Sequence, residues 1–130
     1  MVLNVRKRKK DILLHDYIYQ FMEIKNFNFG LGIGDEKYEK KNKIFENNIE
    51  DIICEIQNHK LYDANKVNII LGGNSKFLID LSLKYSIGLN QWQGSIENID
   101  NKIDLFTKSS ISESKISYCT KNLKFSTKEL

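Results

Sequence analysis

NFNFGLGIGDE, residues 26–36, alternates large apolar side chains with glycines. The odd positions hold Phe27, Phe29, Leu31 and Ile33, whereas Gly30, Gly32 and Gly34 stand at even positions. Because successive side chains of a strand point to opposite faces, this pattern predicts a strand over 27–34 with one apolar, buried face. The other face is nearly bare backbone. We expect a closely packed helix on it, with a flat ligand as the alternative.

Helices and strands alternate on both sides of this stretch. Apolar spacing predicts helices over 11–24, 37–58, 75–85 and 91–106, and KVNIIL predicts a buried strand near 67–72. KISYCTKNLKFS predicts a C-terminal β-hairpin around Lys121 and Asn122. The order indicates an α/β (or α+β) fold, a single layered domain over 1–130 with a small mixed sheet and three to four packed helices. Residues 107–114 are expected to form a flexible loop.

Composition is typical of a globular protein, with 41% hydrophobic residues and a net charge of +3. A basic N-terminal tail is expected over 1–10, where a run of cations offers contacts to nucleic acid: Arg6, Lys7, Arg8, Lys9 and Lys10. Cys54 and Cys119 lack metal-ligand spacing and are expected to be free thiols. No signal or membrane segment is evident, which favours a cytoplasmic protein without membrane contact.

The segment VNIILGGNSKF places a glycine pair between a strand and a helix. Free backbone N–H groups and the helix dipole favour an anion at such a helix start. The predicted ligand-binding residues are Gly72, Gly73, Asn74, Ser75 and Lys76, with Gly34 and Asp35 from the end of the first strand. The two strand ends converge if the strands are parallel neighbours. A simple turn with a capped helix is the competing interpretation of the glycine pair.

Residues 75–106 also outline a helix, a short break and a second helix, as in a helix-turn-helix. In that arrangement Trp92 and Ile96 are buried, while Gln91 and Gln93 are exposed and suited to adenine edges. Against DNA binding, the second helix has no basic residue before Lys102. A helical hairpin packed on a sheet is the alternative.

FNFGLGIGDE resembles the F-x-F-G-I-G-I-G-[DE] strand of SatD-like proteins and, more loosely, the palm domains of nucleotidyl cyclases. The resemblance covers about ten residues of 130. The acidic central hairpin that such palms need for metal-dependent catalysis has no counterpart, and Asn74 stands where an acid is expected. The resemblance therefore implies no activity for this chain.

Taken together, these patterns favour a small cytoplasmic α/β module that binds a phosphate-bearing ligand such as a nucleotide. A helix-turn-helix DNA-binding regulator is one alternative. A viral or plasmid-type accessory protein that acts by binding another protein is the other. No catalytic residues, metal ligands or cofactor are predicted, because neither histidine and neither cysteine stands in a recognisable catalytic or metal-binding pattern. An enzyme ranks below the binding functions, and the sequence leaves the oligomeric state open.

Overall fold

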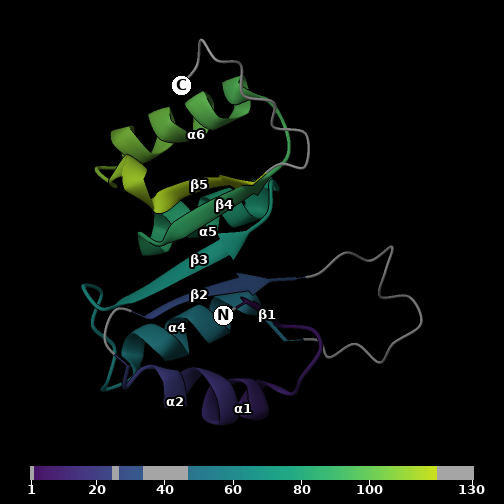
Figure 1. Ribbon diagram of the computed structural model, residues 1–130, viewed down its shortest axis with the longest axis vertical. Coiled ribbons are helices and arrows are strands. Elements are labelled where there is room, and N and C mark those ends of the chain that lie inside the picture. The colour runs from purple at the N-terminus through teal and green to yellow at the C-terminus, as the bar shows by residue number, and fades with distance from the viewer. Residues whose placement is uncertain (1, 25–26, 34–46, 120–130) are drawn as a thin grey trace, which may run out of the picture. The chain divides into compact units, whose positions relative to one another are not determined.

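The computed structural model describes residues 2–24, 27–33 and 47–119 of the chain (Figure 1). Contacts divide the chain into two compact units, a first unit Met1–Gly72 and a second unit Gly73–Leu130. Within each unit, helices connect strands that pair in parallel. The predicted α/β class is therefore confirmed.

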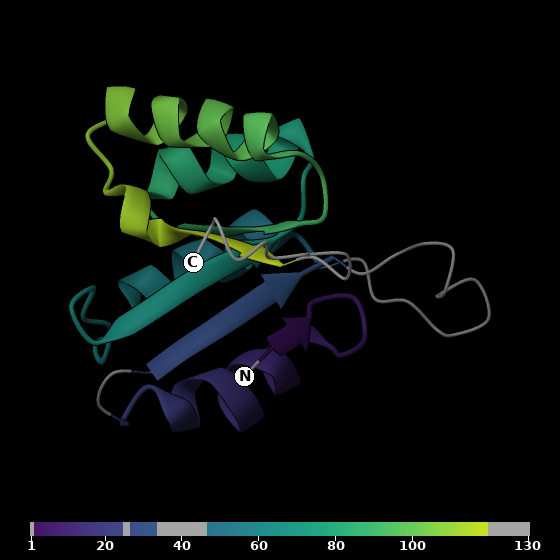
Figure 2. The same cartoon turned by 45° about the horizontal axis from the view of Figure 1, so that its top comes forward.

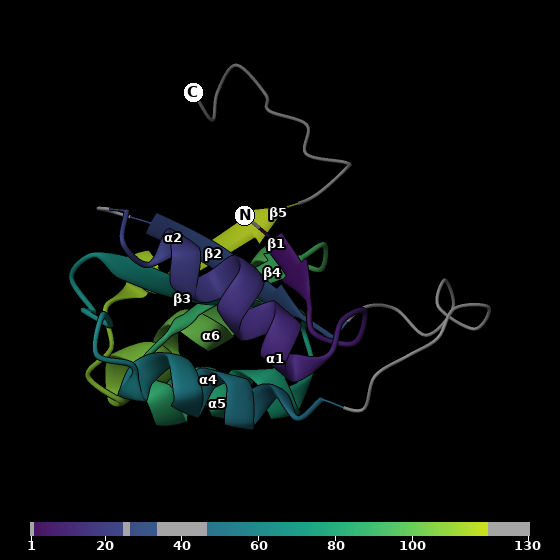
Figure 3. The same ribbon diagram turned by 90° about the horizontal axis from the view of Figure 1, so that it is seen from below.

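The first unit is a three-stranded parallel sheet with helices between its strands. Its elements are β1 (Val2–Asn4), α1 (Lys10–Ile12), the π-helical turn η1 (Leu13–Ile18), α2 (Tyr19–Phe21), β2 (Phe27–Gly32), α4 (Ile49–Asn58) and β3 (Val67–Gly72). The segment α1–η1–α2 corresponds to the helix predicted over 11–24, and η1 contacts α4 (Figure 3). The predicted part 37–46 of the longer helix lies outside the described residues.

The core of the first unit forms on the odd face of β2. Phe29 and Leu31 are fully buried, as the alternating pattern predicts, whereas Phe27 and Ile33 at the ends of the stretch are only partly buried. The Phe27 ring stacks on Phe21, with 5.1 Å between the ring centroids. β2 lies between β1 and β3, so its apolar side chains have strand neighbours on both sides.

The even face of β2, which carries the glycines, differs from the expectation of a closely packed helix. A Cβ atom added to Gly30 would meet the Val2 side chain at 3.5 Å and the Ile70 carbonyl oxygen at 3.7 Å. These are ordinary contacts with neighbouring strands, and none of the nearest atoms in the described residues belongs to a helix. The predicted close helix packing is therefore wrong at Gly30. Beside it, the Asn68 side-chain amide donates to Asn28 Oδ1 across the exposed face.

The N-terminal residues join the sheet of the first unit. Val2–Asn4 forms β1 and pairs with β2, and both Leu3 and Val5 are buried. Residues 2–5 of the predicted basic tail are therefore part of the folded unit, because Leu3 and Val5 place apolar side chains in its core. The basic residues follow in the connection to α1.

The second unit is a two-stranded parallel sheet with two long helices. Its elements are α5 (Lys76–Tyr85), β4 (Gly88–Trp92), α6 (Ile96–Lys108), the 3-10 turn η2 (Glu113–Lys115) and β5 (Ile116–Cys119). Figure 2 shows α5 and α6 on the same side of β4 and β5. Leu81 from α5 and Phe106 from α6 are buried on this side, as is Leu89 from β4.

Three details of the second unit differ from the sequence-based expectation. Residues 88–92 form a strand instead of a break followed by helix, so α6 begins only at Ile96. β5 pairs in parallel with β4, and α6 forms the crossover between them. The pairs β1–β2 and β2–β3 are parallel as well, so the predicted mixed sheet is wrong for these three pairs. The turn and second strand of the predicted hairpin lie outside the described residues. In the predicted loop 107–114, Ile111 is buried.

Candidate functional site

The connection between β3 and α5 reaches the carboxyl end of β4. The backbone N–H of Gly73 donates to the Asn90 carbonyl at 3.1 Å. One residue further, the Asn74 side-chain amide donates to the Trp92 carbonyl at 2.7 Å. Asn74, which the sequence analysis places among the ligand-binding residues, is thereby fixed at the end of β4.

A buried lysine lies behind Asn74. Lys102 of α6 is only 5% exposed, and its ammonium group donates to Gln91 Oε1 at 2.5 Å and to Asn74 Oδ1 at 3.3 Å. Both acceptors are neutral amides. None of the ion pairs found among the described residues involves Lys102. We refer to Asn74, Gln91 and Lys102 as the Lys102 cluster. It holds a buried positive charge that forms no ion pair with a carboxylate of the described residues.

The burial of Lys102 changes the pKa of its ammonium group. Desolvation by burial lowers the pKa of the Lys102 ammonium group below its ordinary value of 10.5. The two amide oxygens solvate the charge only in part, because each contributes a dipole and no net negative charge. An anion placed against the ammonium group would supply the missing charge and favour the protonated form.

Gln91 connects the lysine to the loop between β4 and α6. Its side-chain nitrogen donates to the carbonyls of Gln93 at 2.8 Å and Ser95 at 3.4 Å, which turns its oxygen toward Lys102. Gln93 and Gly94 both have positive φ angles, 58° and 90°. A Cβ atom at Gly94 would lie 2.7 Å from Gln91 Nε2, so only glycine lets the loop approach this side chain.

Two helices begin shortly after residues of the cluster, α5 after Asn74 and α6 after Gln91. Ser75 caps α5 by accepting from the Leu78 N–H at 3.3 Å, and Ser95 caps α6 by accepting from the Asn98 N–H at 3.2 Å. In each helix the earlier N–H groups have no acceptor within the helix. Together with the helix dipoles, these groups favour negative charge near the residues that hold Lys102. Glu97, an exposed acid in the first turn of α6, opposes this effect.

The predicted ligand-binding residues have different places in the structure. Asn74 belongs to the Lys102 cluster, and Ser75 caps α5, as described above. Gly72 is exposed at the end of β3. Gly34 and Asp35 lie outside the described residues, so the expected convergence of the two strand ends stays a prediction.

Gly73 and Lys76 make contacts within the second unit, and their predicted ligand binding stays a prediction. Gly73 has a φ angle of 149°, and a Cβ atom there would lie 2.5 Å from Leu78 Cδ1. The lack of a side chain at Gly73 therefore leaves room for Leu78 of α5. Lys76 extends into solvent and pairs with Asp80 at 2.6 Å, one turn along α5. The cation that contacts Asn74 is Lys102 and not Lys76.

The outline of a helix-turn-helix over 75–106 is replaced by helix, strand and helix. Gln91, expected to be exposed, is 1% exposed and bonded within the cluster. Trp92 and Ile96, expected to be buried, are 44% and 73% exposed. The reason is that Gln91 lies on the same face of β4 as buried Leu89, and Trp92 lies on the opposite face.

Sequence reasoning missed Lys102 and the role of Gln91. One signal was available, because Lys102 lies three residues after Ile99 and four before Phe106, on the apolar side of its helix. A lysine at such a position needs a polar partner, and the partners come from a loop and a strand far away in the sequence. Helical spacing alone does not reveal those partners.

The predicted nucleic-acid contacts, Arg6, Lys7, Arg8, Lys9 and Lys10, belong to the first unit. Arg8 lies over the Tyr17 ring, with its guanidinium carbon 4.7 Å from the ring centroid, and Lys10 pairs with Glu55 at 2.5 Å. Hydrogen bonding to Glu55 raises the pKa of Lys10. Two members of the run are thus engaged with neighbouring side chains.

Metal-binding clusters and membrane-spanning helices are absent from the described residues. Across residues 2–24, 27–33 and 47–119, no cluster of three or more His, Cys, Asp or Glu side chains is arranged to hold a metal ion. In the same residues, each helix is too short or too polar to cross a membrane.

No protein-family model, no curated protein and no solved structure matches this chain.

Proposed function

We propose that this protein binds a phosphate-bearing small molecule, such as a nucleotide, at the Lys102 cluster. One observation carries the proposal, namely the buried Lys102 ammonium group whose hydrogen-bond acceptors are amide oxygens. Holding a charge in this position is costly unless an opposite charge joins it. A phosphate group would provide that charge together with acceptors for the remaining ammonium proton.

The surroundings of Lys102 suit phosphate better than a single carboxylate. The N-termini of α5 and α6 offer backbone N–H groups from two helices, and phosphate has enough oxygens to accept from more than one donor. Asn74 joins these features, since its oxygen contacts Lys102 and its nitrogen holds the end of β4. Ligands of α/β proteins bind preferentially at the carboxyl ends of strands, which is where Asn74 lies.

The experiment is a thermal-shift screen with pyrophosphate, nucleoside mono-, di- and triphosphates, and sulfate as a comparison. Ligand at a hundredfold excess over its dissociation constant stabilises the fold by about 2.7 kcal/mol, which is readily measured. Trp92 is the single tryptophan of the sequence, and its carbonyl is bonded to Asn74. A change in its emission on titration would therefore report on this end of β4.

Two variants locate the binding. Lys102→Met removes the charge at similar length and is expected to abolish the shift, whereas Lys76→Met removes an exposed cation that pairs with Asp80 and is expected to leave the shift intact. Asn74→Ala provides a second test if Lys102→Met does not fold. The proposal is wrong if no phosphate compound stabilises the protein, or if Lys76→Met and not Lys102→Met abolishes the shift.

A further inference from the structure

The two amide side chains that accept from Lys102 differ in their exposure to solvent. Gln91 is 1% exposed, and its Oε1 accepts from the ammonium group at 2.5 Å. Asn74 is exposed, and its Oδ1 accepts at 3.3 Å. The contact with Gln91 is therefore both the shorter and the more deeply buried of the two. An anion from solvent reaches the ammonium group from the side of Asn74, where the weaker contact lies.

The amide of Gln91 can present only its oxygen to Lys102. Its side-chain nitrogen donates to the carbonyls of Gln93 and Ser95. A flipped amide would oppose donor to donor at Lys102 and acceptor to acceptor at both carbonyls. Gln91 therefore meets the ammonium group with a dipole of fixed direction.

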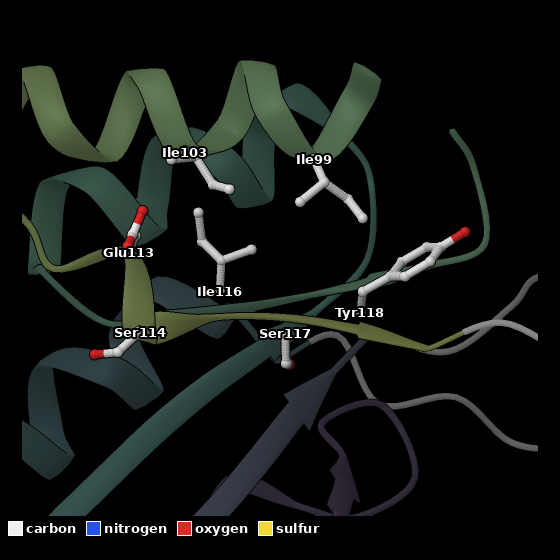
Figure 4. Close-up of a pocket in the computed structure, with 7 residues that line it drawn as sticks. All are labelled: Ile99, Ile103, Glu113, Ser114, Ile116, Ser117 and Tyr118. Carbon is white, nitrogen blue, oxygen red and sulfur yellow. The ribbon is translucent and has the colours of Figure 1, made fainter. Parts of the chain in front are cut away.

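The loop that fixes Gln91 is itself held by β5. The backbone N–H of Gln93 donates to the Cys119 carbonyl at 2.7 Å, and the Tyr118 hydroxyl donates to the Gly94 carbonyl at 2.8 Å. Figure 4 shows the Tyr118 side chain extending from β5 with its hydroxyl toward the chain that leads into α6. The position of the Gln91 oxygen is thus set by contacts within the second unit, which is the support that a preorganised site requires.

Gln91 supplies a dipole at a place where a glutamate of the same length would supply a full negative charge. Opposite charges at hydrogen-bond distance attract strongly where water is excluded, as it is around Gln91 and Lys102. A carboxylate at position 91 would therefore balance the charge of Lys102 from within the fold. An external anion would then meet a neutral pair, whereas with the amide it meets a positive charge.

We propose that Gln91 is a specificity-determining residue, which positions the Lys102 ammonium group and, as an amide, leaves its positive charge to be balanced by a bound anion. The inference rests on the proposed function, because the anion is the phosphate group assigned there. The phosphate replaces the weaker contact with Asn74, and the contact with Gln91 is kept. Gln91 acts through Lys102 and does not itself contact the phosphate.

The test is Gln91→Glu in the full chain, with calorimetric titration of pyrophosphate and NMR titration of the lysine Cε–Hε signals. We expect the carboxylate to raise the pKa of Lys102 in the absence of pyrophosphate, because an opposite charge favours the protonated form. We expect the affinity for pyrophosphate to fall at least about tenfold, because the charge of Lys102 is already balanced.

Asn90→Asp is the matched control. It adds the same charge at the neighbouring position of β4, on the opposite face of the strand. Its carboxylate keeps an oxygen that accepts from the Ser117 hydroxyl, as Asn90 Oδ1 does at 2.7 Å. Both the pKa of Lys102 and the affinity for pyrophosphate should change far less in this variant than in Gln91→Glu.

Asn74→Asp provides a second test if Gln91→Glu does not fold, since a glutamate cannot donate to the two loop carbonyls. It places a carboxylate against Lys102 from the exposed side and is expected to cause the same two changes. An unchanged pKa of Lys102 in the folded variant, or pyrophosphate binding as tight as in the wild type, would overturn the inference alone. Failure of the wild type to bind pyrophosphate would overturn the proposed function, and the inference with it.

Discussion

Lys102 carries a charge into a place where its hydrogen-bond acceptors are amide oxygens, and its protonation should affect stability. Since the pKa of Lys102 is lowered in the folded state, the unfolded chain binds more protons between that lowered value and 10.5. The free energy of unfolding contributed by this residue therefore rises as pH increases through that interval. Below the interval the folded state pays for a buried charge, and above 10.5 both states are neutral.

The measurement compares denaturant unfolding of the wild type and Lys102→Met from neutral pH to above 10.5. We expect the wild type to gain stability relative to the variant as pH rises. Pyrophosphate should reverse this trend, because it favours the charged form of the lysine. A difference between the two proteins that does not vary with pH would show that Lys102 has the same pKa in the folded and unfolded states.

Phe29 tests the register of β2 at the same scale. Its side chain is fully buried, and the register places it beside Ile69 of β3. Truncation leaves a cavity that rigid strands on both sides cannot close, so Phe29→Ala should lower the free energy of unfolding by about 3–5 kcal/mol. Denaturant unfolding measures this loss. Asn28→Ala, on the exposed face, is the matched control and should change stability far less.

At the scale of elements, a glycine in a strand and a glycine in a connection should respond differently to substitution. Gly73→Ala places a Cβ atom 2.5 Å from Leu78 at a φ angle of 149°, which L-residues rarely adopt. We expect a loss of at least about 1–3 kcal/mol from backbone strain alone. Gly30→Ala meets only ordinary contacts and should be tolerated. The measurement is thermal unfolding of both variants. Equal losses of stability would contradict the ordinary contacts that a Cβ atom at Gly30 makes.

Elements whose signal is local were predictable from the sequence. The alternation in residues 26–36 predicts β2, and Ser75 before an apolar run predicts the start of α5. β4 was missed because Trp92, its last residue, stands four positions before Ile96 and so continues the helical spacing of α6 across the loop between them. The candidate site was predictable only in part. Asn74 follows from the glycine pair, whereas Lys102 depends on tertiary contacts with Gln91 that no local pattern contains.

At the scale of the whole molecule, the reactivity of the two cysteines tests how each is exposed in the folded chain. Neither Cys54 nor Cys119 takes part in a disulfide; Cys119 is exposed and Cys54 is partly buried in α4. Thiol counting under denaturing, non-reducing conditions should give two thiols per chain, the number of cysteines in the sequence. In the native protein Cys119 should react first, because its side chain is open to reagent. A count of zero would indicate a disulfide.

The central claim is that phosphate binds against Lys102, and an NMR titration of the lysine Cε–Hε signals tests it most directly. Lys102→Met identifies the signal of Lys102 by its absence, and Lys76→Met does the same for an exposed cation. Pyrophosphate should shift the Lys102 signal in a saturable way and raise the pKa of that residue, while the Lys76 signal stays in place. An unchanged Lys102 signal at pyrophosphate concentrations that stabilise the fold would contradict the account.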